Sequence, residues 1–133
     1  MNEHDLIRMI RREPPIDQHI VEHSTPVVSF GNFKAARVAT LGINPSKREF
    51  FEKDVLLVGA GRRLATLKSL TAQRLSSLNK DQIDDVWADC SDYFNRNPYK
   101  RWFAPLDYIL QEGLGQSYYG DGLACHLDLP LGH

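Results

Sequence analysis

The sequence predicts an α/β fold of three layers with a mostly parallel sheet. Two apolar, strand-like runs at 37–43 and 123–129 are separated by three helical patterns. Strands joined by long helical crossovers pair in parallel, so we expect these two runs to be parallel neighbours. A further run, VVSFGNF at 27–33, adds a strand before them. The 133 residues are the length of one domain, which we expect to span 1–133.

The first elements are a helix and a buried strand. Apolar residues at helical spacing, from Leu6 to Ile10, predict an amphipathic helix over 3–12. The pair Pro14-Pro15 must end that helix, because proline removes a donor and disfavours helix in its predecessor. The strand at 37–43 shows little polar alternation, which is typical of a central strand covered on both faces.

Three helices are then expected before the last strand. Leucines at helical spacing follow Gly59 and Gly61 and predict a helix from about Arg62. A second helix, over 80–94, has capping residues before it, acidic residues in its first turns and an apolar face. A third, in NPYKRWFAPLDYILQEGLG, places Trp102 in the core and ends at Gly113.

Composition excludes several classes of function. With 16 Lys and Arg against 17 Asp and Glu, the net charge of -1 argues against a uniformly basic nucleic-acid coat. Cys90 and Cys125 form no C-x-x-C pair, so we expect buried, reduced thiols and neither a metal centre nor another cofactor. No apolar run approaches the ~20 residues of a membrane span, so we expect a cytoplasmic protein without a membrane partner.

The segment GINPS, which follows the strand at 37–43, is the main candidate for chemistry. Ligands of open α/β sheets bind at the carboxyl ends of strands. Gly42 permits close approach, Asn44 offers an amide, and Pro45 would hold that amide in one orientation. The alternative is that Asn44-Pro45 simply starts a turn, and local chemistry alone favours this alternative.

The segment TLGINPS, placed after a buried strand, closely resembles the first motif of the uracil-DNA glycosylase superfamily. The form is the Gly-x-Asn-Pro motif of the mismatch-specific and single-strand-selective branches. The stretch LLVGAGRRLATL resembles the glycine bend and helix that follow in that superfamily, and ACHLDL occupies the place of its next parallel strand. The resemblance covers 27 to the carboxyl terminus, and only the first motif is specific.

The resemblance implies a base-flipping hydrolase that cuts the bond between a damaged base, usually uracil, and deoxyribose. Asn44 would hold the attacking water. Leu57 stands where the family stacks the base on an aromatic ring, and His126 or Asp128 stands where it reads the base with asparagine. The base pocket would then comprise Gly42, Ile43, Pro45, Ser46, Leu57 and His126.

The partner implied by the resemblance is DNA, either single-stranded or carrying a lesion. Lys47, Arg48, Arg62 and Arg63 lie close to the proposed site in the sequence and would contact its phosphates. The alternative for these four residues is an ordinary solvated surface, and sequence leaves the two interpretations even.

The sequence also departs from the superfamily. Its members continue with two further parallel strands and a second motif that contains histidine, whereas this chain stops at LPLGH. We therefore expect an incomplete, truncated sheet with an exposed strand edge, prone to homo-oligomers or aggregation. A missing half of the site weakens the case for activity, so two alternatives stay open: a non-catalytic nucleic-acid-binding relative, and an α/β domain that binds a small molecule or a protein.

Overall fold

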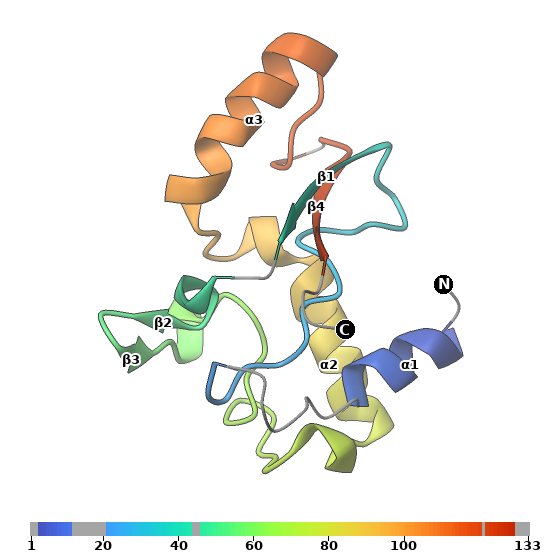
Figure 1. The fold of residues 1–133 in the computed structure, drawn as a ribbon, viewed down its shortest axis with the longest axis vertical. Coiled ribbons are helices and arrows are strands. Elements are labelled where there is room, and N and C mark those ends of the chain that lie inside the picture. Colours follow the sequence, from blue (N-terminus) through green and yellow to red (C-terminus); the bar gives the residue numbers. More distant parts are fainter. Residues whose placement is uncertain (1–2, 12–20, 44–45, 121, 130–133) are drawn as a thin grey trace.

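The computed structural model describes residues 3–11, 21–43, 46–120 and 122–129 (Figure 1). Two short sheets are present, a parallel pair and an antiparallel hairpin, together with helices and 3-10 turns. The helices are α1 (Glu3–Arg11), α2 (Lys80–Ser91) and α3 (Lys100–Leu114), and the strands are β1 (Val38–Ile43), β2 (Phe51–Glu52), β3 (Val55–Leu56) and β4 (Ala124–Leu129). The α/β class is thereby confirmed at this coarse level.

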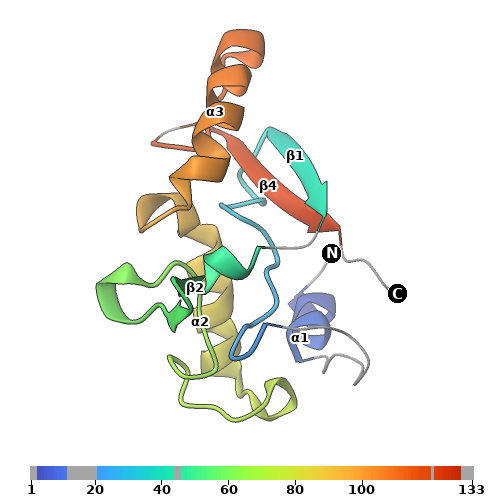
Figure 2. The same cartoon turned by 60° about the vertical axis from the view of Figure 1, so that its left-hand side comes forward.

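The parallel pair β1–β4 confirms the predicted pairing of the two apolar runs. The register runs from Val38 opposite Ala124 to Ile43 opposite Leu129. Side chains alternate between faces along a strand, so Thr40 and the position of Gly42 share a face with their β4 partners, His126 and Asp128. Figure 2 shows the two strands side by side, ending at the same edge of the molecule.

The prediction of a strand at 27–33 is wrong, because the structure forms no strand there. Within that segment only Phe30 makes a ladder contact, an isolated antiparallel bridge with His126. The segment leaves the strand because Ser29 donates its hydroxyl to the Gly31 carbonyl, and Gly31 turns at φ +97° to donate its N–H to Cys90.

The prediction that β1 is covered on both faces is also wrong for the described part of the chain. Leu41 is 66% exposed and Ala39 is exposed as well. Within the described residues β1 pairs only with β4. An apolar composition reports β propensity without saying which neighbours will cover a strand, so the homo-oligomer expected at its edge stays a prediction.

The helices are confirmed in part. α1 and α2 form where they were expected, and α2 begins with a reciprocal capping box between Asn79 and Gln82. α3 ends at Gly115 (φ +64°), not Gly113, and Trp102 is 54% exposed, so its predicted place in the core is wrong. Figure 1 shows α3 beside the β1–β4 pair and the β2–β3 hairpin on the opposite side of the molecule from α1.

The helix predicted from Arg62 is absent, and the segment forms turns instead. Thr66 and Ser69 exchange side-chain to backbone hydrogen bonds of 2.9 Å, which satisfies backbone groups that a helix would have paired. The Thr25 hydroxyl donates to the Ala65 carbonyl at 2.7 Å and fixes the segment against a distant part of the chain. Tertiary contacts thus override the leucine spacing.

An aromatic cluster forms the core under the inner face of the β1–β4 pair. Phe30, Tyr93, Phe94, Phe103 and Tyr118 pack ring against ring, with centroid distances from 4.7 to 5.5 Å. Both cysteines are buried free thiols, as predicted. None of the described helices has the length and apolar character that crossing a membrane requires.

Candidate active site

The site at the carboxyl ends of β1 and β4 begins where the described chain is interrupted. Asn44 and Pro45 lie outside the described residues, so their predicted roles are not tested by the geometry. The chain resumes at Ser46, whose exposed side chain accepts the Arg48 N–H at 3.2 Å and caps the 3-10 turn Lys47–Glu49. Ser46 therefore holds the turn that follows the motif.

Gly42 makes room for two side chains of β4. A Cβ atom at Gly42 would lie 2.5 Å from Asp128 Oδ1 and 2.8 Å from His126 Nε2, distances that no side chain tolerates. The close approach expected at Gly42 is therefore filled, in this structure, by the neighbouring strand. The Asp128 carboxylate thus lies directly over the backbone of β1 at Gly42.

His126 is the centre of a buried hydrogen-bond chain. It is 2% exposed, with Nε2 2.9 Å from Asp128 Oδ1 and Nδ1 2.7 Å from Thr40 Oγ1. The Thr40 hydroxyl lies in turn 2.6 Å from the Tyr118 hydroxyl. Both ring nitrogens are engaged, so His126 is placed to orient Asp128 and has no nitrogen left with which to read a base.

Glu49 adds a second carboxyl group to the site. It is 3% exposed, and its Oε2 atom accepts the Tyr93 hydroxyl at 2.6 Å. The Tyr93 oxygen accepts the Tyr99 N–H at 2.9 Å, which directs the hydroxyl proton towards Glu49. Burial raises the pKa of Glu49 to about 7, against the lowering effects of the Tyr93 hydrogen bond and the Arg63 charge.

Asp128 also contributes to the raised pKa of Glu49, through like-charge repulsion. The two carboxyl groups are therefore close enough for their charges to interact. Pairs of carboxyl groups in different environments are the usual source of an acid and a base at neutral pH. Within the described residues no group of three or more His, Cys, Asp or Glu side chains is arranged to hold a metal ion.

The four cations expected at phosphates separate into two pairs. Arg62 forms an ion pair with Asp89, which Arg96 also contacts at 2.6 Å. Arg63 is 9% exposed; it donates Nη1 to the Arg48 carbonyl at 3.2 Å and lies over the Tyr99 ring. Both side chains make contacts within the protein, and these contacts disfavour the predicted binding of DNA phosphates. That binding stays a prediction.

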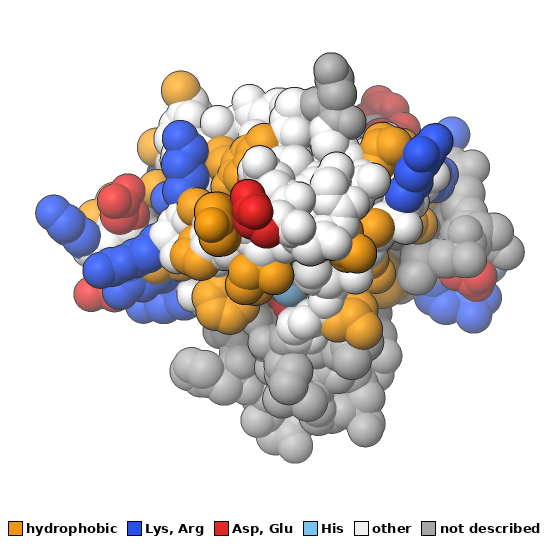
Figure 3. Space-filling model, turned by 90° about the horizontal axis from the view of Figure 1, so that it is seen from above, with side chains coloured by type: hydrophobic (Ala, Val, Ile, Leu, Met, Phe, Trp, Pro, Cys, Tyr) orange, Lys and Arg blue, Asp and Glu red, His pale blue; other side chains and the backbone are white. Residues whose placement is uncertain are grey.

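Lys47 and Arg48 are exposed and lie beside the site on the turn that carries Glu49. Lys47 pairs with the exposed Asp54 at 3.0 Å, a contact that water and salt weaken, and Arg48 lies over the Tyr99 ring at 5.9 Å. Figure 3 shows Lys and Arg side chains at both sides of the face seen from above, with acidic side chains near them.

The position predicted to stack a base lies on the β2–β3 hairpin. Leu57 is half-buried and donates its N–H to the Phe50 carbonyl at 2.8 Å. Phe50 itself is 3% exposed and belongs to the core. No described contact joins Leu57 to the His126–Asp128 pair.

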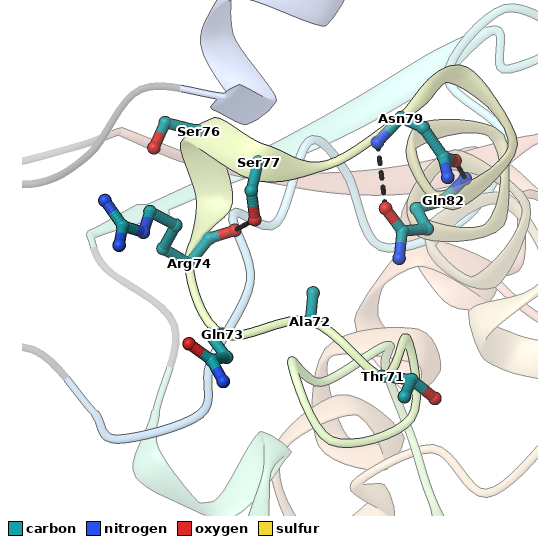
Figure 4. Close-up of a pocket in the computed structure, with 8 residues that line it drawn as sticks. All are labelled: Thr71, Ala72, Gln73, Arg74, Ser76, Ser77, Asn79 and Gln82. Carbon is teal, nitrogen blue, oxygen red and sulfur yellow. Dashed lines mark hydrogen bonds between the residues drawn. The ribbon is translucent and has the colours of Figure 1, made fainter.

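A separate cavity of about 620 Å³ lies between the 3-10 turn Leu75–Ser77 and the start of α2 (Figure 4). Three of its polar side chains are already bonded within the protein. Asn79 and Gln82 bond each other, Gln82 also donates to the Leu70 carbonyl, and Ser77 donates to the Arg74 carbonyl. Figure 4 shows Arg74 extending away from Asn79 and Gln82, so the cavity gathers no reactive groups.

Sequence reasoning missed Thr40, Glu49 and Tyr93. A signal for Thr40 was available in the sequence. Thr40 and Gly42 are two residues apart on one predicted strand, as His126 and Asp128 are on the strand predicted to pair with it, so all four positions can share one face. Glu49 has no such signal, since its burial arises only when the turn after the motif packs against Tyr93. No protein-family model matches the sequence, and neither does any curated protein or solved structure.

Proposed function

We propose that this chain hydrolyses the N-glycosidic bond of a damaged base, usually uracil, that is flipped out of DNA. The observation that carries the proposal is the Asp128 carboxylate, fixed by His126 over Gly42 at the edge where Asn44 follows β1. The resemblance of TLGINPS to the first motif of the uracil-DNA glycosylase superfamily supports the same reaction.

The chemistry of base excision fits this arrangement. The transition state has a cation-like sugar and a departing base anion, and a nearby carboxylate stabilises the cation. Asn44 is proposed to position the water, and the exposed Lys47 and Arg48 are proposed to hold flanking phosphates. No cofactor is required for hydrolysis of this kind.

The test measures release of free uracil from single-stranded and mismatched DNA by the full chain. We expect release by the wild-type protein and its loss in Asn44→Ala. Asn95→Ala, an exposed asparagine in the 3-10 turn Tyr93–Asn95, is the matched control and should keep full activity. Equal release by Asn44→Ala and wild type, across several lesions, would refute the proposal.

A second candidate is a relative that binds nucleic acid without cutting it. The exposed Lys47 and Arg48, with Arg48 over the Tyr99 ring, favour such a surface. This candidate expects salt-sensitive DNA binding that is lost when both cations are replaced by alanine, with no base release from any substrate. The absence of binding at low salt would favour a third class, a domain for a small molecule or a protein.

A further inference from the structure

Four side chains from three parts of the chain form one continuous hydrogen-bond chain at the site. Tyr118 lies 2.6 Å from Thr40, Thr40 lies 2.7 Å from His126 Nδ1, and His126 Nε2 lies 2.9 Å from Asp128 Oδ1. Thr40 belongs to β1, His126 and Asp128 belong to β4, and Tyr118 follows α3. The chain therefore depends on the parallel register of β1 and β4.

The protons along this chain have one consistent direction. An ionised carboxylate only accepts, so the proton between His126 and Asp128 belongs to Nε2. In a neutral imidazole Nδ1 then accepts, and the Thr40 hydroxyl donates to it. The Thr40 oxygen is left to accept the Tyr118 hydroxyl, whose pKa burial raises, so that Tyr118 remains a donor.

One other contact competes for the Thr40 proton. The Cys125 carbonyl lies 3.5 Å from Thr40 Oγ1, at the limit of a hydrogen bond, whereas His126 Nδ1 lies at 2.7 Å. The shorter contact is the stronger one, so it takes the proton. The direction from Tyr118 to Asp128 follows.

The side chains at both ends of the hydrogen-bond chain are buried. The His126 side chain is 3% exposed and the Asp128 side chain 8% exposed, while Tyr118 is 4% exposed. Of these groups, Asp128 lies nearest the carboxyl ends of the two strands, opposite Gly42. A carboxylate is also a far stronger base than the amide of Asn44.

We infer that Asp128 is the catalytic base that activates the hydrolytic water, and that Tyr118, Thr40 and His126 are positioning residues that hold it. This inference rests on the proposed function. Asp128 takes one proton from water as the water oxygen bonds to C1′ of the sugar. The C1′–N bond breaks, its electron pair leaves with the base, and the base anion takes a proton from solvent while Asp128 returns its own.

The first experiment reads the hydrogen-bond chain without using activity. Long-range proton–nitrogen NMR spectra of the full chain distinguish the protonated from the unprotonated ring nitrogen of each histidine, and His126→Gln assigns the signal. We expect a neutral His126 with its proton on Nε2. A neutral ring with its only proton on Nδ1 would overturn the inference, because Asp128 would then lack its donor.

The second experiment measures single-turnover release and DNA affinity. Asp128→Asn keeps the shape and an acceptor for His126, and we expect it to lower the rate about 100-fold or more with unchanged affinity. Thr40→Val should lower the rate about tenfold or more, again without loss of affinity, and Thr40→Ser should restore it. A rate of Asp128→Asn within threefold of wild type would overturn the inference and leave the proposed function standing.

The outcomes separate the inference from the proposed function. If wild type releases no base from any substrate, both the proposed function and the catalytic role of Asp128 fall. The NMR measurement still decides the direction of the hydrogen-bond chain in that case. If Thr40→Val unfolds, Thr40→Ser and the tautomer of His126 in the wild type carry the test.

Discussion

Replacing Glu49 with Gln should change how the stability of the protein depends on pH. Glu49 is 3% exposed, and burial raises its pKa from 4.5 to about 7. Between these two values the folded protein binds a proton that the unfolded chain has released. The free energy of unfolding should therefore fall as the pH rises from about 4.5 to about 7 and change no further above it.

The size of the effect follows from the same two values. The difference between about 7 and 4.5, at about 1.4 kcal/mol per pH unit, corresponds to about 3 kcal/mol lost by the wild-type protein. Gln keeps the size of the side chain and an oxygen that accepts the Tyr93 hydroxyl, but it does not ionise. The variant should therefore gain about 3 kcal/mol relative to wild type between pH 4.5 and pH 8.

Urea unfolding at a series of pH values from 4.5 to 8 measures this difference directly. Glu52→Gln is the matched control, because Glu52 is an exposed glutamate on β2 and should leave the pH dependence unchanged. A constant difference between wild type and Glu49→Gln over the whole range would refute the reasoning. The reasoning would also be refuted if Glu49→Gln lost stability relative to wild type as the pH rises.

The remaining predictions concern Gly42 and the exposed cations. Gly42→Ala should destabilise the protein by about 1–3 kcal/mol, because the new Cβ displaces the β4 side chains. The control is Gly113→Ala in α3, whose Cβ meets no atom within 4 Å and should not destabilise the protein. Thermal unfolding compares the two variants. Lys47→Ala with Arg48→Ala should lower the slope of log affinity for DNA against log salt by about 2, and the exposed Lys68→Ala should leave it unchanged. An unchanged slope in the double variant would remove both cations from the interface.

Part of the fold and of the site was readable from local patterns. A capping residue at Asn79 or Ser77 predicts the start of α2, and the structure shows Asn79 in a capping box with Gln82. The apolar runs of β1 and β4 predict parallel pairing because helices connect them. His126 and Asp128 were candidates because the resemblance places a base-reading residue on the last strand. Their contact with each other over Gly42 was not predicted, since it depends on the absence of a side chain at Gly42.

The elements that sequence predicted wrongly are those decided by distant contacts. The leucines after Arg62 have helical spacing, yet Thr66 and Ser69 take the backbone partners and Thr25 holds the segment from far along the chain. Trp102 has the spacing of a core residue but lies outside, because Phe103 occupies the aromatic cluster instead. Spacing defines a face of a helix, and packing decides which face is buried.

The sequence by itself determined the α/β class, the parallel relation of 37–43 to 123–129 and the position of the GINPS segment at a strand end. These features depend on periodicity and on connection length, which are local. Only the tertiary structure decided that Glu49 is buried against Tyr93, that Arg62 and Arg63 are engaged inside the protein, and that Asp128 lies over Gly42. Burial and pairing between residues far apart in the chain depend on how the elements pack, and no local pattern specifies that packing.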